Sequence, residues 1–402
     1  MSRTETAPGV FPHWRRNQIA VTAAAFIGFT GFTLVMPFLP LYFTQLGVAD
    51  PGDVAIWSGV SLGVTPAITA AMAPVWARVA DRVGRKLMVV RSLVSFVLIM
   101  SLMAFVTAPW QVFVLRAIQG LFAGYGAIAM TMAAESAPPE HVAAAIGWVQ
   151  TAQRLGPALG PAIGGALAAA LGLRRAFLVS ASFYLVAFLL VVFAYRERMG
   201  RPIGQTESGA PDPSFATFRA VPHFTLFMAT IFGLQLVDRS FGPVLPLYLL
   251  EIGVTEPRVP FLSGVLFTTT AIAAALGNQT SALLLRKQPV ATLMPAMALA
   301  GAFAAAVFGA APPMTLLIAT AVVFGYGIGV ATTSIYTAAT HAVPPVMRGV
   351  AFGYLTTAYL IGLAVSPVVA GLVGALSMRA VFFCDAAGLA ALAWVVKQRM
   401  SS

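Results

Sequence analysis

The segment PFLPLYFTQLG at residues 37–47 decides the fold, because it returns as PVLPLYLLEIG at residues 243–253. Other parts of the chain repeat at the same offset of 206 residues. The residues of the first half that recur in this way are Pro37, Pro40, Leu41, Tyr42, Gly47, Pro138, Pro139, Gly147, Gly156, Pro161 and Gly165. An apolar composition raises the number of chance matches, but one offset over well-separated segments indicates a duplication. The sequence therefore predicts two structurally equivalent halves.

The composition places most of both halves in lipid. The chain is 59% hydrophobic and 9% charged, whereas soluble domains are roughly a quarter charged. Its apolar runs reach about 20 residues without strict alternation, which favours membrane-spanning helices over a barrel. The run from Ile19 to Leu46 is too long for the core of a signal peptide. The single cysteine, Cys384, excludes a disulfide framework.

We therefore expect an all-α membrane protein with twelve transmembrane helices in two pseudo-symmetric six-helix halves. The expected spans are 18–46, 54–76, 87–107, 110–134, 143–171, 175–195, 224–250, 259–285, 290–311, 313–340, 349–376 and 379–396. Residues 1–195 and 224–402 form the halves. Residues 196–223 contain RERMGRPIGQTESGAPDPS and are rich in Gly, Pro and Ser, which indicates a flexible cytoplasmic linker.

The distribution of charge predicts the orientation. A net charge of +11 could indicate a nucleic-acid partner. Most Lys and Arg residues, however, lie in short loops on the side that both termini share, as orientation signals do. Only Arg174, Arg175, Arg258 and Arg379 fall on the other side. We therefore expect no nucleic-acid partner, and a multi-pass protein of the cytoplasmic membrane with both termini in the cytoplasm.

The loop after the second span, ARVADRVGRK at residues 77–86, carries a charge cluster. Asp81 and Arg85 share a face if the helix continues, Gly84 permits a tight turn, and Glu135 lies at a similar depth. The cluster could be a cytoplasmic gate that forms only when that side is closed, or an anchor that only orients the span. The residues concerned are Asp81, Arg82, Gly84, Arg85, Lys86 and Glu135.

The fifth span contains GPALGPAIGG at residues 156–165. Gly156, Gly160 and Gly164 form one stripe, and small residues let helices approach closely in lipid. Pro157 and Pro161 remove backbone donors and bend the helix. Together with Gly165, this motif predicts a sliding contact between the halves; the alternative is tight packing within one half.

The charged residues within the spans include Arg116, Arg154, Asp238 and Arg239. A charge near the bilayer centre costs about 3 kcal/mol, and such residues usually face a cavity or a partner. Arg116 could hydrogen-bond neighbouring carbonyls or act electrostatically on a proton site or on substrate. Arg154 should point away from the glycine stripe, and its role stays open.

Asp238 is the acidic residue that we expect near mid-membrane in a cavity-lining span. A carboxylate that moves between wet and dry surroundings can bind and release a proton. Adjacent helical residues do not face each other, so Arg239 need not neutralise Asp238. The alternative is a salt bridge that fixes this span. Asp385 lies in the last, peripheral span, where we expect a structural role.

An apolar and adaptable cavity should lie between the halves. Aromatic and Met side chains suit varied ligands, although an aromatic residue on a membrane helix more often serves packing. The residues expected to line the cavity are Phe29, Phe32, Tyr125, Phe232, Gln235, Phe241, Tyr326 and Tyr336.

These motifs resemble those of the major facilitator superfamily along essentially the whole chain. ARVADRVGRK is similar to the pattern GxLADRxGRK, with Ala77 and Val79 as departures. GPALGPAIGG resembles the signature GxxxGPxxGG of the twelve-span drug:proton antiporters, and LRAIQG at 115–120 resembles their buried-arginine motif. The end of the first span, PFLPLY, is also similar to bacterial multidrug and tetracycline exporters.

The resemblance implies export of small amphipathic compounds or drugs in exchange for protons by alternating access. The alternatives are an uptake symporter or facilitator for a small metabolite such as a sugar, and a membrane enzyme or non-transporting scaffold. The sequence has no recognisable metal-ligand cluster, nucleotide loop or nucleophile–base pair, so we expect no enzyme and neither cofactor nor metal. The expected partners are a small-molecule substrate, protons and the lipid bilayer, around a monomer.

Overall fold

The structure is a computed structural model that describes residues 13–197, 221–344 and 347–401, and the regular structure in these ranges is helical. The first group of helices comprises α1 (Trp14–Val35), α2 (Leu39–Gln45), α3 (Pro51–Val83), α4 (Arg85–Met103), α5 (Pro109–Phe122), α6 (Tyr125–Ser136), α7 (Val142–Leu171) and α8 (Leu173–Leu189). The second group comprises α10 (Phe224–Asp238), α11 (Phe241–Glu251), α12 (Val259–Leu285), α13 (Val290–Gly309), α14 (Met314–Ala342), α15 (Arg348–Leu376) and α16 (Met378–Ser401).

The predicted fold class is confirmed. In the described part of the chain, 10 segments are long and apolar enough to cross a membrane. The two remaining expected spans are α7, which carries the Gly- and Pro-rich motif, and the pair α10 and α11, which are 15 and 11 residues long. The chain is therefore a multi-pass membrane protein of two six-helix halves.

Several spans are interrupted. A short 3-10 turn, Met36–Phe38, separates α1 from α2, and Arg239 and Ser240 separate α10 from α11. Between α5 and α6 the chain turns at Gly124, whose φ of 111° suits glycine. Side chains satisfy the carbonyls that this turn frees. Trp76 Nε1 donates to Leu121 O at 2.7 Å, and the Arg91 guanidinium donates to Phe122 O at 3.3 Å.

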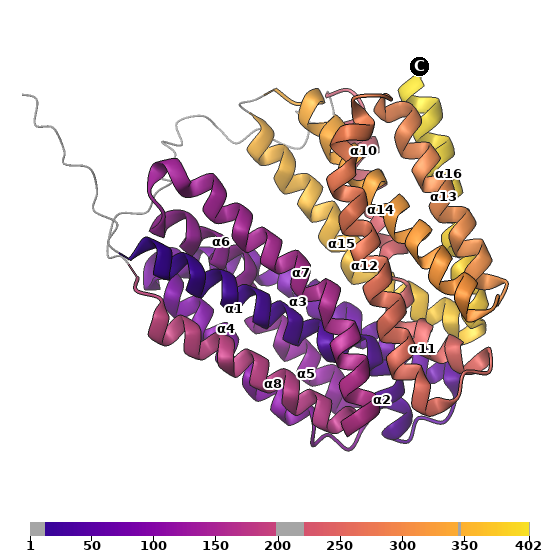
Figure 1. The fold of residues 1–402 in the computed structure, drawn as a ribbon, viewed down its shortest axis with the longest axis horizontal. Helices are drawn as coiled ribbons and strands as arrows, with labels where there is room; N and C mark the ends of the chain where they lie inside the picture. The colour runs from indigo at the N-terminus through magenta and orange to yellow at the C-terminus, as the bar shows by residue number, and fades with distance from the viewer. Residues whose placement is uncertain (1–12, 198–220, 345–346, 402) are drawn as a thin grey trace, which may run out of the picture.

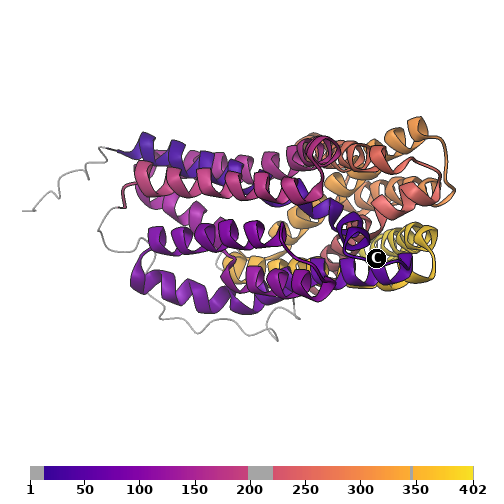
Figure 2. The same cartoon turned by 90° about the horizontal axis from the view of Figure 1, so that it is seen from below.

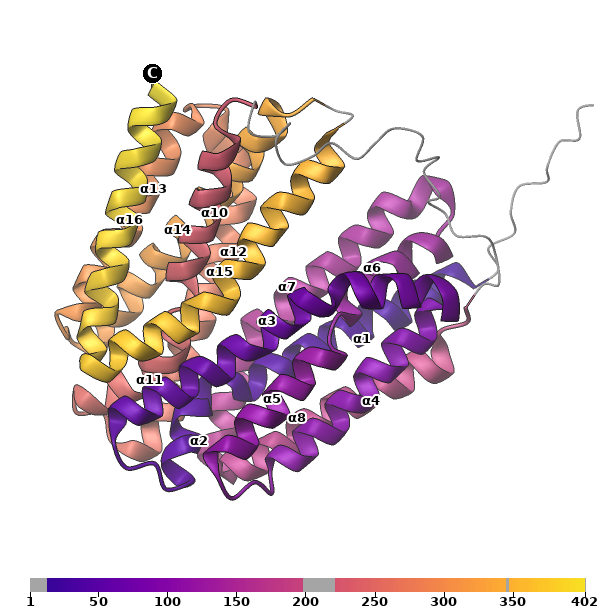
Figure 3. The same ribbon diagram turned by 180° about the vertical axis from the view of Figure 1, so that it is seen from behind.

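The two halves meet at one end and diverge at the other (Figures 1 and 3). We call the diverging end the terminal face; α1, α4 and α7 begin there and α14 ends there. The joined end is the opposite face, where α2, α7, α11 and α15 end. Seen from below, the halves lie side by side, indigo to magenta on the left and orange to yellow on the right (Figure 2). The main contacts between them pair α3 with α15 and α7 with α12.

Glycines at repeat-related positions make these contacts. Gly165 of α7 meets the backbone of Pro260 on α12, and Gly371 of α15 meets the backbone of Ala55 on α3. A Cβ atom added at Gly371 would lie 2.5 Å from the Ala55 carbonyl oxygen, so larger residues do not fit. Gly165 and Gly371 correspond under the internal repeat. Close helix approach through glycine is the usual packing mode in lipid, and here it joins the halves twice.

Most of the expected linker, residues 198–220, lies outside the described residues. Its first residue packs against the first half: Arg196 N donates to Asn17 Oδ1, and Asn17 Nδ2 donates to Arg196 O, both at 2.9 Å. Arg196, the first residue of the expected linker, is thus held on α1.

Gly63→Leu should force the halves apart at the opposite face. An added Cβ atom would lie 2.5 Å from Ala364 O and 2.8 Å from Val368 Cγ2 across the contact. Overpacking of this kind costs about 1–3 kcal/mol. Spin labels at Ala49→Cys and Glu256→Cys, in a Cys384→Ser background, should report longer separations by pulsed electron paramagnetic resonance.

Gly147→Leu is the matched control. It makes the same change on α7, where an added Cβ atom has no neighbour within 4 Å. This variant should keep the wild-type separation at the opposite face. If the Gly63 variant also keeps it, the glycine contact does not hold the halves together.

Candidate functional site

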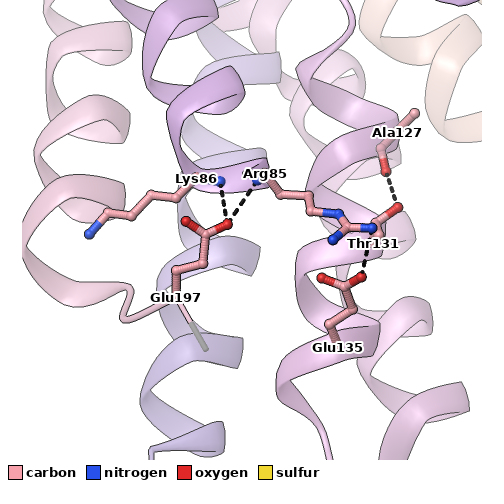
Figure 4. Close-up of polar contacts among 6 residues, drawn as sticks. All are labelled: Arg85, Lys86, Ala127, Thr131, Glu135 and Glu197. Carbon is pink, nitrogen blue, oxygen red and sulfur yellow. Dashed lines mark hydrogen bonds and ion pairs between the residues drawn. The ribbon is translucent and has the colours of Figure 1, made fainter. Parts of the chain in front are cut away.

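A cluster of charged side chains surrounds the start of α4 at the terminal face. Gly84 has a φ of 96°, which glycine tolerates, and it separates α3 from α4. The Glu197 carboxylate accepts the backbone N–H groups of Arg85 and Lys86 at 2.8 and 3.1 Å (Figure 4). A carboxylate in this position satisfies free N–H groups and interacts favourably with the helix dipole. Glu197 therefore caps α4.

The side chains of the same two residues extend in different directions (Figure 4). Arg85 Nη2 lies 3.0 Å from Glu135 Oε1 on α6. Lys86 Nζ donates to the carbonyls of Val192 and Tyr195, at 2.9 and 2.7 Å. Burial, with the nearby carboxylates of Glu197 and Glu135, raises the pKa of the Tyr195 phenol. The cluster thus ties α4 to α6 and to the end of α8.

This arrangement corrects the expected gate. The pair of Arg85 and Glu135 was expected only when the terminal face is closed, but it forms here while the halves diverge at that face. Both partners belong to the first half, so their contact does not require the second half. Arg82 is exposed. The side chain of Asp81 lies outside the described residues.

The glycine stripe of α7 also lies within one half. Added Cβ atoms at Gly156 and Gly160 would lie 2.9 Å from Phe26 O and Thr30 O of α1, and Gly164 meets Leu34 of the same helix. The prediction that this stripe forms the sliding contact between the halves is therefore wrong. The extensive packing of α7 on α1 agrees with this placement of the stripe.

A different face of α7 reaches the second half. Gly165 meets Pro260, the Pro161 carbonyl meets Gly264, and Ala162 N donates to Thr268 Oγ1 of α12 at 3.0 Å. Pro157 is half-buried on the same helix. Within the motif, the contact between halves is thus made around residues 161–165.

The same face of α7 is polar toward the terminal face. Arg154 precedes Pro161 by seven residues, close to two helical turns, so the two residues point in similar directions. Arg154 is exposed, as are its neighbours Gln150 and Thr151. Gly147 has no neighbour within 4 Å of an added Cβ atom, and neither has Gly353, its repeat counterpart on α15. This polar face of α7, formed by Gly147, Gln150, Thr151 and Arg154, is open where the halves diverge.

The break in the seventh span changes the interpretation of Asp238. Because α10 ends at Asp238, the next residue leaves the helical path and the two side chains meet. Arg239 Nε lies 3.1 Å from Asp238 Oδ2. The expectation that they need not neutralise each other is wrong. The Asp238 side chain is 19% exposed and that of Arg239 is 47% exposed, so the pair lies at a partly open site.

Arg116 lies wholly inside the first half. Its Nε donates to Ser61 O of α3 at 3.1 Å, and its Nη1 donates to Gln119 Oε1 at 2.6 Å. The guanidinium carbon lies 5.6 Å from the centre of the Phe32 ring. The residue is 1% exposed. These contacts match the hydrogen-bonding role rather than direct contact with a substrate.

The expected cavity-lining residues divide into two groups. Phe29, Phe32, Phe232, Tyr326 and Tyr336 are partly exposed. Tyr326 shares a hydrogen bond with Thr280, and Tyr336 stacks on Phe352.

The other three are buried, and for them the prediction is wrong in this conformation. Phe241 stacks on Phe324 with ring centres 4.8 Å apart, within a cluster that includes Phe308 and Phe382. Tyr125 packs on Phe29, and Gln235 lies against Gly362.

Sequence reasoning missed Glu197, Ser240 and the polar face at Gln150 and Thr151. Glu197 lies in a segment whose composition indicates a linker, and nothing local distinguishes it. The polar face could have been found by helical projection, since Gln150 and Arg154 share a side with Pro161.

Glu197→Gln should destabilise the first half modestly. The amide keeps an acceptor but loses the charge at the start of α4, a change worth about 0.3–1 kcal/mol at an exposed helix end. Thermal unfolding in detergent, followed by intrinsic fluorescence, should show a lower midpoint. The control is Glu140→Gln, whose carboxylate is 68% exposed. Equal midpoints for both variants would contradict a capping role.

Comparisons with known proteins fit this architecture. A family model described as Major Facilitator Superfamily matches residues 21–313 and 227–399. Multidrug resistance protein MdtG of Erwinia billingiae is 34% identical over 266 residues, which cover 66% of this chain and 64% of that relative. The match therefore spans less than two thirds of that relative's length. The same-named protein of Escherichia coli O81 is 31% identical over 284 residues, 69% of this chain and 67% of the relative.

Solved structures show the same fold. A bacterial homologue of the human lysosomal transporter Spinster, in an inward-facing and occupied conformation, has a TM-score of 0.77 at 16% identity and covers 98% of this chain and 96% of its own. The nucleoside transporter NupG has a TM-score of 0.75 at 14% identity, covering 96% and 99%. The matched family model, the two-half architecture and the relatives agree with the resemblance in the motifs. The chain belongs to the Major Facilitator Superfamily and has the fold of a membrane transporter.

Proposed function

We propose that this transporter exports small amphipathic compounds in exchange for protons. The observation that carries the proposal is the ion pair of Asp238 and Arg239 at the break of the seventh span. A carboxylate inside a membrane span is costly and is most often functional. Its partial exposure beside a helix break gives it access to protons. The multidrug resistance names of the curated relatives support an amphipathic substrate.

Protonation would act on the break itself. A neutral Asp238 loses its Coulomb attraction for Arg239, which then keeps its contact with Tyr359 of α15 and is free to turn toward substrate. Tyr359 already lies next to Arg239. Since α15 makes the largest set of contacts with the first half, through α3, a change at Arg239 can reach the contact between the halves.

The substrate would approach along the polar face of α7. Arg154, Gln150 and Thr151 are exposed there, while the partly exposed aromatic residues Phe29, Phe32 and Phe232 supply apolar surface. An amphipathic molecule needs both kinds of surface. The glycine contacts near the opposite face close the path on that side, so the conformation seen here opens at the terminal face.

The rest of the proposal follows from the sequence. We place the terminal face in the cytoplasm of a bacterial cell, because most Lys and Arg residues lie there. The halves are residues 1–195 and 224–402, joined by 196–223, in a monomer. In this orientation the conformation is inward-open, ready to take up cargo from the cytoplasm or the inner leaflet.

Asp238→Asn should abolish proton-coupled export and leave the fold intact. The amide keeps the shape but cannot titrate. In inside-out vesicles with an imposed proton gradient, a screen of amphipathic dyes should find compounds whose uptake dissipates the gradient. For such a compound, uphill transport by the variant should fall about tenfold or more, equivalent to at least about 1.4 kcal/mol.

Glu251→Gln is the matched control, since Glu251 pairs with Arg379 at 2.9 Å near the opposite face. It should transport like the wild type. Uphill export with an unchanged pH profile in the Asp238 variant would rule out Asp238 as the coupling group. Movement of substrate and proton in the same direction would indicate a symporter instead.

A further inference from the structure

A second carboxylate lies buried at the break of the seventh span. Asp385 of α16 is 7% exposed, and Ser240, between α10 and α11, is 2% exposed. Their side chains meet: Ser240 Oγ lies 2.5 Å from Asp385 Oδ2. The last span was expected to be peripheral and its acid structural. In the structure, the Asp385 carboxyl group instead contacts Ser240, the residue at which the seventh span breaks.

The two short contacts of the Ser240 hydroxyl depend on whether Asp385 carries a proton. Its Oγ lies 2.8 Å from Val237 O and 2.5 Å from Asp385 Oδ2, and both of these oxygens are acceptors when Asp385 is ionised. A serine hydroxyl carries a single hydrogen. With an ionised Asp385, one of the two short O···O contacts would contain no hydrogen. With a protonated Asp385, the acid donates to Ser240 Oγ and Ser240 donates to Val237 O, so both contacts are hydrogen bonds.

No cation compensates a charge on Asp385 in the described part of the chain. The helices packed on α16 are α13, α10, α15 and α11, and α13 has no titratable side chain. The titratable and charged side chains that the structure describes on the others are Asp238, Arg239, Tyr248, Glu251, Tyr354 and Tyr359, and on α16 itself Arg379, Cys384, Lys397 and Arg399; the side chain of Arg348, at the start of α15, lies outside the described residues. Arg239 pairs with Asp238, and Arg379 pairs with Glu251. A buried, unpaired carboxylate is strongly disfavoured.

We infer that Asp385 is a second proton-binding site, that it carries its proton in the conformation seen here, and that release of this proton rearranges the break of the seventh span. This inference deepens the proposed function and rests on it for the link to transport. The protonation of Asp385 itself does not depend on transport: it rests on the contacts of Ser240 and on the burial of the carboxyl group.

Asp385 loses its proton to water when another conformation of the transport cycle brings water to the carboxyl group. The hydroxyl hydrogen of Ser240 then turns from Val237 O to the new carboxylate. Val237 O then loses the 2.8 Å bond from the Ser240 hydroxyl and keeps its backbone contacts with Arg239 N and with Ser240 N, the latter at 3.3 Å. The end of α10 is loosened beside Asp238, and rebinding of the proton restores the present geometry.

Infrared spectroscopy of the purified protein in lipid tests the protonation directly. The C=O stretching band of a protonated carboxyl group should be present, shift in D₂O, and decrease as the pH is raised. The band should disappear in Asp385→Asn and persist in Asp238→Asn. Ser240→Ala should shift its frequency, because the hydrogen bond to Ser240 is lost.

Ser281→Ala is the matched control, since Ser281 is also buried and its hydroxyl donates only to Gly277 O in its own helix. It should leave the band unchanged. If no protonated carboxyl band depends on Asp385, or if Ser240→Ala leaves that band where it was, the inference is overturned, whatever the transport assays show.

Transport by Asp385→Asn tests whether release of the Asp385 proton rearranges the break of the seventh span. The amide can donate to Ser240 as the protonated acid does, so the variant should hold the present conformation and lose about tenfold or more of uphill export. Export at the wild-type rate and with the wild-type pH profile would overturn the link to the break. If the band is present but wild-type vesicles exchange no protons, the proposed function fails and the protonation of Asp385 stands.

Discussion

The structure depends on one constraint: in lipid, every backbone N–H and C=O group needs a partner within the protein. An uninterrupted helix pairs these groups within its own backbone. Several spans of this chain are interrupted within the membrane, and each interruption frees backbone groups that need other partners. At the break between α5 and α6, Trp76 and Arg91 supply donors for the freed carbonyls. At the break between α10 and α11, Ser366 of α15 bonds Leu236 O at 2.5 Å, and Ser240 bonds Val237 O.

These side chains make the breaks specific. Each donor comes from a neighbouring helix or from the break itself, so the position of a break is coupled to the packing around it. Ser366 illustrates the point: it stands in the second copy of the glycine motif, where the first copy has Gly160. In the first half Gly160 lets α1 pack closely on α7, whereas in the second half the Ser366 hydroxyl donates to a carbonyl of α10. The duplicated halves thus share a backbone plan but differ in chemistry, and the two carboxylates at the break of the seventh span, Asp238 and Asp385, both lie in the second.

The repeat and the apolar runs were sufficient to predict the fold, because both are properties of long segments. Partners within the site were harder to predict. Asp238 and Arg239 meet only because α10 ends between them, and no proline or glycine occupies either position to mark that end. The glycine stripe could be located from spacing, but small residues suit any close neighbour, so the pattern did not distinguish α1 from the second half. Glu197 caps α4 across a large separation in sequence, which local patterns cannot reveal.

The open glycines on the diverging faces have a thermodynamic consequence. Gly147 and Gly353 are related by the repeat, and each faces empty space on a surface between the halves. When two surfaces seal, long side chains lose rotamer freedom, at about 1.5–2 kcal/mol for residues such as Lys, Met or Gln, whereas glycine loses none. At these two positions, closing the terminal face orders no side chain. Repeated opening and closing therefore carries little entropic penalty there, and the two arrangements can stay close in free energy.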